Sequence, residues 1–102
     1  MICAGQTATD RLGNSLHPKD MRKQIIRALD NLEAVLTAAD MNFGNIIRLN
    51  IFATDMDKAL QHFDVLGSRF GPLNVAPAMT LLGVTRLALP QLMFEIEATA
   101  AD

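Results

Sequence analysis

The chain has 102 residues, of which 50% are apolar (the set AVILMFWYC) and 20% are charged, with 9 Lys and Arg against 11 Asp and Glu. A chain of this length can bury a core without disulfides or a structural metal, and its single cysteine, Cys3, excludes an internal disulfide and every zinc site built from several cysteines. The net charge of -2 and the absence of Trp and Tyr indicate that nucleic acid is not a partner, and no apolar run approaches the roughly 18 to 20 residues of a membrane span.

The first predicted element is a short apolar strand over residues 1–7. The polar stretch that follows contains Gly13 and Asn14, residue types that are common in turns, and it predicts an exposed loop. The same N-terminal segment has no basic region and no cleavage pattern of a secretory signal, so we expect a cytoplasmic protein. Because no linker or repeat interrupts the chain, we expect residues 1–102 to form one domain.

An amphipathic helix of about five turns is the clearest prediction from the sequence. It begins near Pro18, whose missing N–H is harmless in a first helical turn, and it ends before Gly44. Its apolar residues recur at intervals of three and four: Met21, Ile25, Leu29, Leu32, Leu36 and Ala39. We expect this stripe to face the core.

Residues 46–54 form a β-rich run, in which alternate side chains point to opposite faces of a sheet. One predicted face carries Ile47, Leu49, Ile51 and Ala53. The other carries Arg48, Asn50, Phe52 and Thr54.

A second helix is expected from Asp55 to Phe70, with Asp55 as its N-cap and Gly71-Pro72 closing it. Its apolar stripe is Leu60, Phe63, Leu66 and Phe70. Asp55 and Asp57 also have the spacing of a metal or phosphate motif, but a helix cap followed by an acid in the first turn explains both residues.

Two further strands are predicted at about 79–86 and 92–100, separated by Leu89-Pro90-Gln91. In the last strand, one face carries Leu92, Phe94, Ile96 and Ala98. The opposite face carries Met93, Glu95, Glu97 and Thr99.

The order β-α-β-α-β-β predicts an α+β sandwich, a mixed sheet with both helices on one face. The face without helices then carries Phe52, together with either Met79 and Leu81 or Leu82 and Val84. A half-apolar uncovered face, combined with the high apolar share of so small a chain, predicts a homo-oligomer.

Several short motifs stand in a fixed order along almost the whole chain. They are Ala-Gly-Gln-Thr at 4–7, Gln24 with Leu29-Asp30-Asn31-Leu32, Phe52-Ala53-Thr54-Asp55, Pro77-Ala78 and Glu95-Ile96-Glu97-Ala98-Thr99-Ala100. Together they resemble the RidA/YjgF family of reactive-intermediate deaminases. The resemblance implies a chorismate-mutase-like fold and a homotrimer with ligand pockets between neighbouring subunits. Active members hydrolyse small 2-imino or 2-enamino acids to 2-keto acids and ammonia in those pockets.

In the family, an arginine directly after the Pro-Ala pair holds the substrate carboxylate, and the glutamate that opens the Glu-Ile-Glu stretch positions a water. Glu95 matches this glutamate, but Met79 stands where the arginine is expected. A thioether carries no charge and cannot anchor a carboxylate. The resemblance thus implies Glu95 as the catalytic residue and Gly5, Met79 and Leu81 as ligand-binding residues, with no metal and no cofactor.

Each of these residues also has a structural explanation. On its own, Glu95 would be a solvated carboxylate on the polar face of a strand, and Gly5 would mark a bulge or close packing. Cys3 is expected in the core, because no basic neighbour in sequence would lower its pKa. Arg48 or Arg86 can in principle replace the missing anchor, although Arg86 lies seven residues from Met79 and so faces the other side of a regular strand.

Two functions remain open at this point. Met79 and Leu81 favour a family member that binds a small apolar or neutral metabolite and lacks the standard deaminase activity. The alternative is an enamine or imine hydrolase in which Glu95 positions the water.

Overall fold

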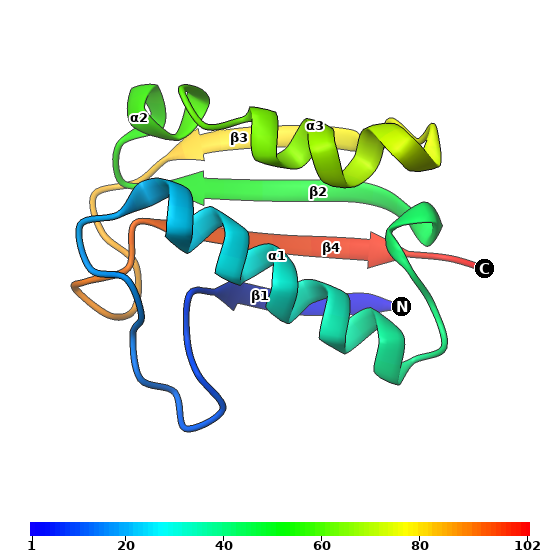
Figure 1. Cartoon of the computed structure of the whole chain (residues 1–102), viewed down its shortest axis with the longest axis horizontal. Helices are drawn as coiled ribbons and strands as arrows, with labels where there is room; N and C mark the ends of the chain where they lie inside the picture. Colours follow the sequence, from blue (N-terminus) through cyan, green and yellow to red (C-terminus); the bar gives the residue numbers. More distant parts are fainter.

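A computed structural model describes all residues from 1 to 102 as an α+β fold, in which one four-stranded sheet carries every helix on the same face (Figure 1). The strands are β1 (Ile2–Thr7), β2 (Ile46–Ala53), β3 (Ala78–Gly83) and β4 (Phe94–Ala100). Their order across the sheet is β1-β4-β2-β3, with β4 antiparallel to both neighbours and β3 parallel to β2. The predicted fold class is confirmed. No helix is both long enough and apolar enough to cross a membrane.

The long helix α1 (Met21–Ala38) runs diagonally across the sheet (Figure 1) and buries the predicted apolar stripe from Met21 to Leu36. Its start was predicted at Pro18, which is wrong, because Asp20 is the N-cap and accepts a 3.0 Å hydrogen bond from the backbone N–H of Lys23. The residues on either side of Pro18 have positive φ angles and cannot continue a helix. Ala39 lies beyond the helix and is exposed.

The second helix is divided, which corrects the prediction of one helix up to Phe70. Two short helices form instead, α2 (Met56–Leu60) and α3 (Asp64–Phe70), joined by a turn. The buried position of α2 also differs from the prediction. Ala59 is buried while the predicted Leu60 is 51% exposed. Asp55 caps α2 as predicted, through a 3.0 Å hydrogen bond from the N–H of Lys58. Gly71 follows α3 as its C-cap and opens the short 3-10 helix η2 (Gly71–Leu73).

A bulge at the start of β2 corrects the predicted face of this strand. The register of β2 against β4 shifts between Ile46 and Arg48. Ile46 is therefore the buried residue, 4% exposed, and Ile47 is 55% exposed. Beyond the bulge the alternation is as predicted, with Leu49 and Ile51 fully buried. The short 3-10 helix η1 (Phe43–Asn45) immediately precedes the bulge.

The third and fourth strands are shorter than predicted, since β3 ends at Gly83 and β4 begins at Phe94. The connecting segment folds back beside the sheet and buries a small second cluster: Ala8, Leu87 and Leu92, with Phe52 and Val84 packed against it. Phe52 is thus partly covered by the chain's own loop, which reduces the apolar area of the face without helices.

The pairing of β3 with β2 decides which residues of β3 face the helices. Met79 lies beside Leu49 and Leu81 beside Ile51, so this pair shares the helix-covered side. Leu82 lies beside Phe52 on the uncovered side. The prediction of a half-apolar uncovered face is wrong at the centre of this face, which is polar. The centre carries Arg48, Asn50, Thr80, Glu95, Glu97 and Thr99.

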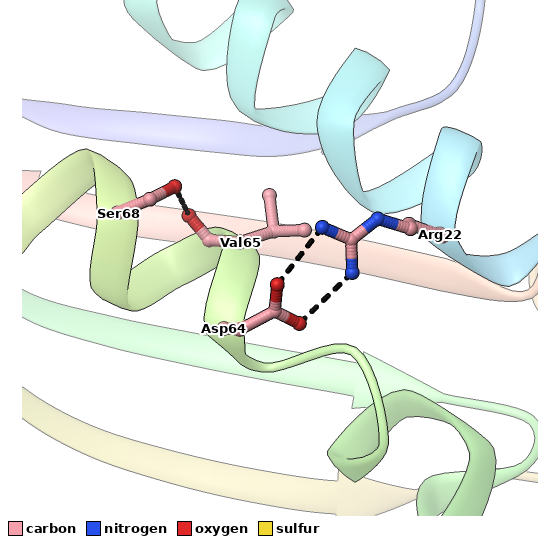
Figure 2. Close-up of polar contacts among 4 residues, drawn as sticks. All are labelled: Arg22, Asp64, Val65 and Ser68. Atoms are coloured by element: carbon pink, nitrogen blue, oxygen red, sulfur yellow. Dashed lines mark hydrogen bonds and ion pairs between the residues drawn. The ribbon is translucent and has the colours of Figure 1, made fainter.

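Polar contacts tie α1 to the rest of the molecule. Gln24 is fully buried, and its side-chain N–H donates to the carbonyl of Gln91 at 2.9 Å while its oxygen accepts from the N–H of Met93 at 2.8 Å. On the outside, Arg22 forms two hydrogen bonds of 2.8 and 2.9 Å with the Asp64 carboxylate and so joins α1 to α3 (Figure 2).

Candidate functional site

Among the predicted site residues, Gly5 on β1 lies beside the side chain of Glu95 on β4. The register of the two strands shifts between Cys3 and Gln6, so a bulge places Gly5 beside the Glu95 side chain. A Cβ atom at residue 5 would lie 2.8 Å from both Cδ and Oε2 of Glu95. Only glycine leaves room for the carboxylate to lie in its present position over β1.

Glu95 is a half-buried carboxyl group without a partner. It makes no hydrogen bond and no ion pair through its side chain. Partial burial raises the pKa of Glu95 above the ordinary glutamate value, and the negative charge of Glu97 raises it further. A carboxyl group of this kind takes up a proton more readily than a surface glutamate and keeps its oxygens free for a ligand.

A hydrogen-bonded pair of side chains, Asn50 and Glu97, lies next to Glu95 on the uncovered face. The side-chain N–H of Asn50 on β2 donates to Oε1 of Glu97 on β4 at 3.1 Å. The Arg48 guanidinium, also on β2, donates to the Thr80 hydroxyl on β3 rather than to a carboxylate. The positive charge on this face is therefore directed away from the two glutamates.

Met79 and Leu81 lie apart from Gly5 and Glu95. Both are on β3, at the opposite edge of the sheet from β1, with β2 and β4 between. They also lie on the other side of the sheet from Glu95, since they are paired with residues that face the helices. The structure brings Gly5 to Glu95 and Met79 to Leu81, but it does not bring the two pairs together within one chain.

The two arginines considered as replacement anchors lie elsewhere. Arg86 is not on a strand, since β3 ends at Gly83, and its guanidinium donates to the carbonyls of Leu87 and Ala88 at 3.2 and 3.3 Å. Arg48 lies on the uncovered face, across the sheet from Met79. Arg48 therefore lies on the opposite face from Met79, and Arg86 is bound to backbone carbonyls of its own loop.

Cys3 has a structural role. It is 3% exposed in the core, as predicted, and burial raises the pKa of its thiol. Nowhere in the chain do three or more His, Cys, Asp or Glu side chains gather in a way that suits a metal ion. The single chain also contains no enclosed pocket.

Sequence reasoning assigned no role to Asn50 and left Glu97 as a charge on the surface or at an interface. The alternation of β2 correctly placed Asn50 on the uncovered face, which was the available signal. What the alternation cannot give is the register of β2 against β4, which sets Asn50 directly opposite Glu97.

Comparison with known proteins finds a matching family, related sequences and similar solved structures. Residues 1–102 match the family described as endoribonuclease L-PSP. A RutC family protein of Pyrococcus horikoshii is 28% identical over 100 residues, which cover 98% of this chain and 77% of that protein. The YjgF gene product of E. coli is 29% identical with a TM-score of 0.84, over 97% of this chain and 77% of its own. E. coli TdcF, solved with bound serine, is 27% identical with a TM-score of 0.86, over 99% and 79% of the two chains.

Proposed function

Because the chain belongs to the endoribonuclease L-PSP family, the family of the RutC and YjgF proteins, we propose that it is a RidA-like homotrimer that binds a small metabolite. The ligand is apolar or neutral and occupies pockets between neighbouring subunits. The trimer is cytoplasmic. Gly5 and Glu95 line each pocket from one side, and Met79 and Leu81 line it from the other.

The separation of the site residues into two pairs is the observation that carries this proposal. Gly5 and Glu95 lie on the uncovered face near one edge of the sheet, and Met79 and Leu81 lie on the opposite face at the other edge. A pocket lined by all four residues therefore needs two copies of the chain. The lack of an enclosed pocket in the single chain agrees with a site that forms only on assembly.

The residues on β3 support an apolar or neutral ligand. Loss of a charge-assisted contact to a carboxylate costs about 2 to 5 kcal/mol, or roughly 30-fold to several-thousand-fold in affinity. Met79 and Leu81 offer only apolar surface, and Met79 is 39% exposed and available for contact. TdcF, a relative, has been solved with bound serine, which supports binding of a small molecule by this fold.

Hydrolysis of an imine or enamine is the second candidate function, and Glu95 favours it. A partly buried carboxyl group with a raised pKa and no protein partner can hold a water and accept its proton. An enamine first takes up a proton at carbon and becomes the imine. The water oxygen then adds to the imine carbon while one proton of the water passes through Glu95 to the nitrogen, which gives a carbinolamine. The hydroxyl proton of the carbinolamine passes to the nitrogen by the same route as the C–N bond breaks, and a keto acid and ammonia are released. This role needs a substrate that binds without the family's arginine.

RNA is not proposed as a substrate despite the description of the family. The net charge is -2, and the uncovered face carries Glu95 and Glu97, which repel phosphate groups.

One assay separates the two functions. A dehydratase generates 2-aminoacrylate or 2-iminobutanoate, and release of the keto acid is followed with the wild type, Glu95→Ala, Met79→Arg and the matched control Met79→Leu. We expect no acceleration by the wild type or Met79→Leu and a gain with Met79→Arg, because the variant restores the carboxylate anchor. Acceleration by the wild type that Glu95→Ala abolishes would overturn the binding-only function in favour of hydrolysis.

A further inference from the structure

Two glutamates share one face of the central strand β4. Glu95 and Glu97 are two residues apart, so both side chains point to the uncovered side of the sheet, and both are half-buried. Two neighbouring carboxyl groups do not ionise independently, because the charge on one opposes the charge on the other. The contacts around the two carboxyl groups therefore bear on how readily Glu95 takes up a proton.

The surroundings of the two carboxyl groups differ in hydrogen bonding. Oε1 of Glu97 accepts the 3.1 Å hydrogen bond from Asn50, whereas Glu95 accepts none. A hydrogen bond from an amide N–H stabilises the ionised form of a carboxyl group. Glu97 therefore has a hydrogen-bond partner on the sheet that holds its carboxyl group in place, and Glu95 has none.

Other charged groups do not reverse this difference. On the neighbouring strand β2, Arg48 donates to Thr80, and in the loop after β3, Arg86 donates to two backbone carbonyls. On the other side, β1 contributes no charged side chain, and its only titratable group, Cys3, is buried on the helix side. The charge of the neighbouring Glu97 raises the pKa of Glu95 in addition to burial.

We propose that Asn50 and Glu97 form a positioning pair for Glu95, in which Asn50 holds the Glu97 carboxylate on the sheet so that Glu95 is the member that takes up and releases the proton. The proposal rests on the second candidate function, in which Glu95 holds a water and accepts its proton. Neither Asn50 nor Glu97 needs to touch the ligand, because both act through Glu95.

Gly5 completes this arrangement from the other side. Since residue 5 has no side chain, the Glu95 carboxyl group can lie against β1 and remain partly buried. Burial and the fixed charge of Glu97 both act in the same direction and raise the pKa of Glu95. The proton of the pair therefore stays on Glu95 at a higher pH than on an isolated glutamate.

The test is a pH titration of the Glu95 side-chain carboxyl carbon by NMR on the full chain labelled with ¹³C-glutamate. It compares the wild type with Glu97→Gln, which keeps the shape and an oxygen that can accept from Asn50, and with Asn50→Ala. The matched control is Glu33→Gln on the outer surface of α1, where the glutamate pairs with Arg69 and not with the sheet.

We expect Glu97→Gln and Asn50→Ala both to lower the titration midpoint of Glu95 toward the ordinary glutamate value, and Glu33→Gln to leave it unchanged. An unchanged midpoint in Glu97→Gln, or an equal shift in Glu33→Gln, would overturn the proposal. A shift in Glu97→Gln without one in Asn50→Ala removes Asn50 from the pair and also counts against it. The titration needs no ligand, so its failure and the failure of the keto acid assay are separate results.

Discussion

Gly5 lies so close to Glu95 that a methyl group on residue 5 would come within 2.8 Å of Cδ and Oε2 of the glutamate. The contact joins the edge strand β1 to the central strand β4 and depends on the bulge in β1. It leaves room over β1 for the one carboxyl group to which the proposed function assigns a role.

The first prediction concerns Gly5→Ala. We expect the variant to fold with a stability within about 1 kcal/mol of the wild type, because the end of the Glu95 side chain can turn away and alanine restricts the unfolded chain. The NMR signal of the Glu95 carboxyl carbon should nevertheless change. The matched control is Gly67→Ala on α3, where a Cβ meets no atom within 4 Å and should stabilise the chain. An unaltered Glu95 signal in Gly5→Ala would contradict the contact.

A second prediction concerns the buried amide of Gln24. Gln24→Leu should lower the free energy of unfolding by about 2 to 4 kcal/mol, because the N–H of Met93 and the carbonyl of Gln91 lose their partners. Urea unfolding measures the loss. Gln61→Leu, at an exposed glutamine after α2, should change stability by no more than about 0.5 kcal/mol. Equal effects of the two substitutions would show that burial of Gln24 is not the cause.

A third prediction follows from the ion pair between α1 and α3 (Figure 2). The hydrogen bonds from Arg22 lower the pKa of Asp64 below its ordinary value of 3.8. The stability that the pair contributes is therefore present above pH 3.8 and lost as the pH falls through the lower, folded-state pKa. Asp64→Asn should make unfolding less sensitive to acid in this range, whereas Asp40→Asn, which removes an unpaired exposed carboxylate, should not. Identical acid curves for the wild type and Asp64→Asn would refute the prediction.

The fourth prediction has the opposite sign, because the pKa of Glu95 is raised. In the range above the ordinary value of 4.5, the folded chain binds more protons at Glu95 than the unfolded chain does. The stability contributed by protonated Glu95 is therefore complete below pH 4.5 and lost as the pH rises through the folded-state pKa. Glu95→Gln should flatten this part of the stability curve, and Glu33→Gln should not. A curve that keeps its slope in Glu95→Gln would show that another group titrates.

The last prediction concerns assembly. We expect the chain to have the mass of a trimer in solution at micromolar concentration, three times 11.1 kDa, measured by light scattering. Leu82→Lys, on the uncovered face, should weaken the assembly, and Leu12→Lys, at an exposed loop position, should not. A monomeric mass for the wild type would count against the proposed pockets between subunits.

Much of the fold is encoded in local patterns of the sequence. The spacing of apolar residues from Met21 to Leu36 predicted the buried side of α1, and Asp55 was correctly predicted as a cap, because both depend on residues a few positions apart. The division between α2 and α3 and the bulge at Ile47 were not predictable in this way. Each is decided by how the segment fits against the sheet and the core.

The match of Glu95 to a family motif, the departure at Met79 and the shared strand face of Glu95 and Glu97 could all be predicted from the amino-acid sequence. The sequence did not predict that Gly5 lies beside Glu95, that Asn50 donates to Glu97, or that Met79 lies on the other side of the sheet. These three relationships depend on the register between strands. A strand's own alternation gives its two faces, but the residues that meet across strands depend on bulges and pairing between distant segments.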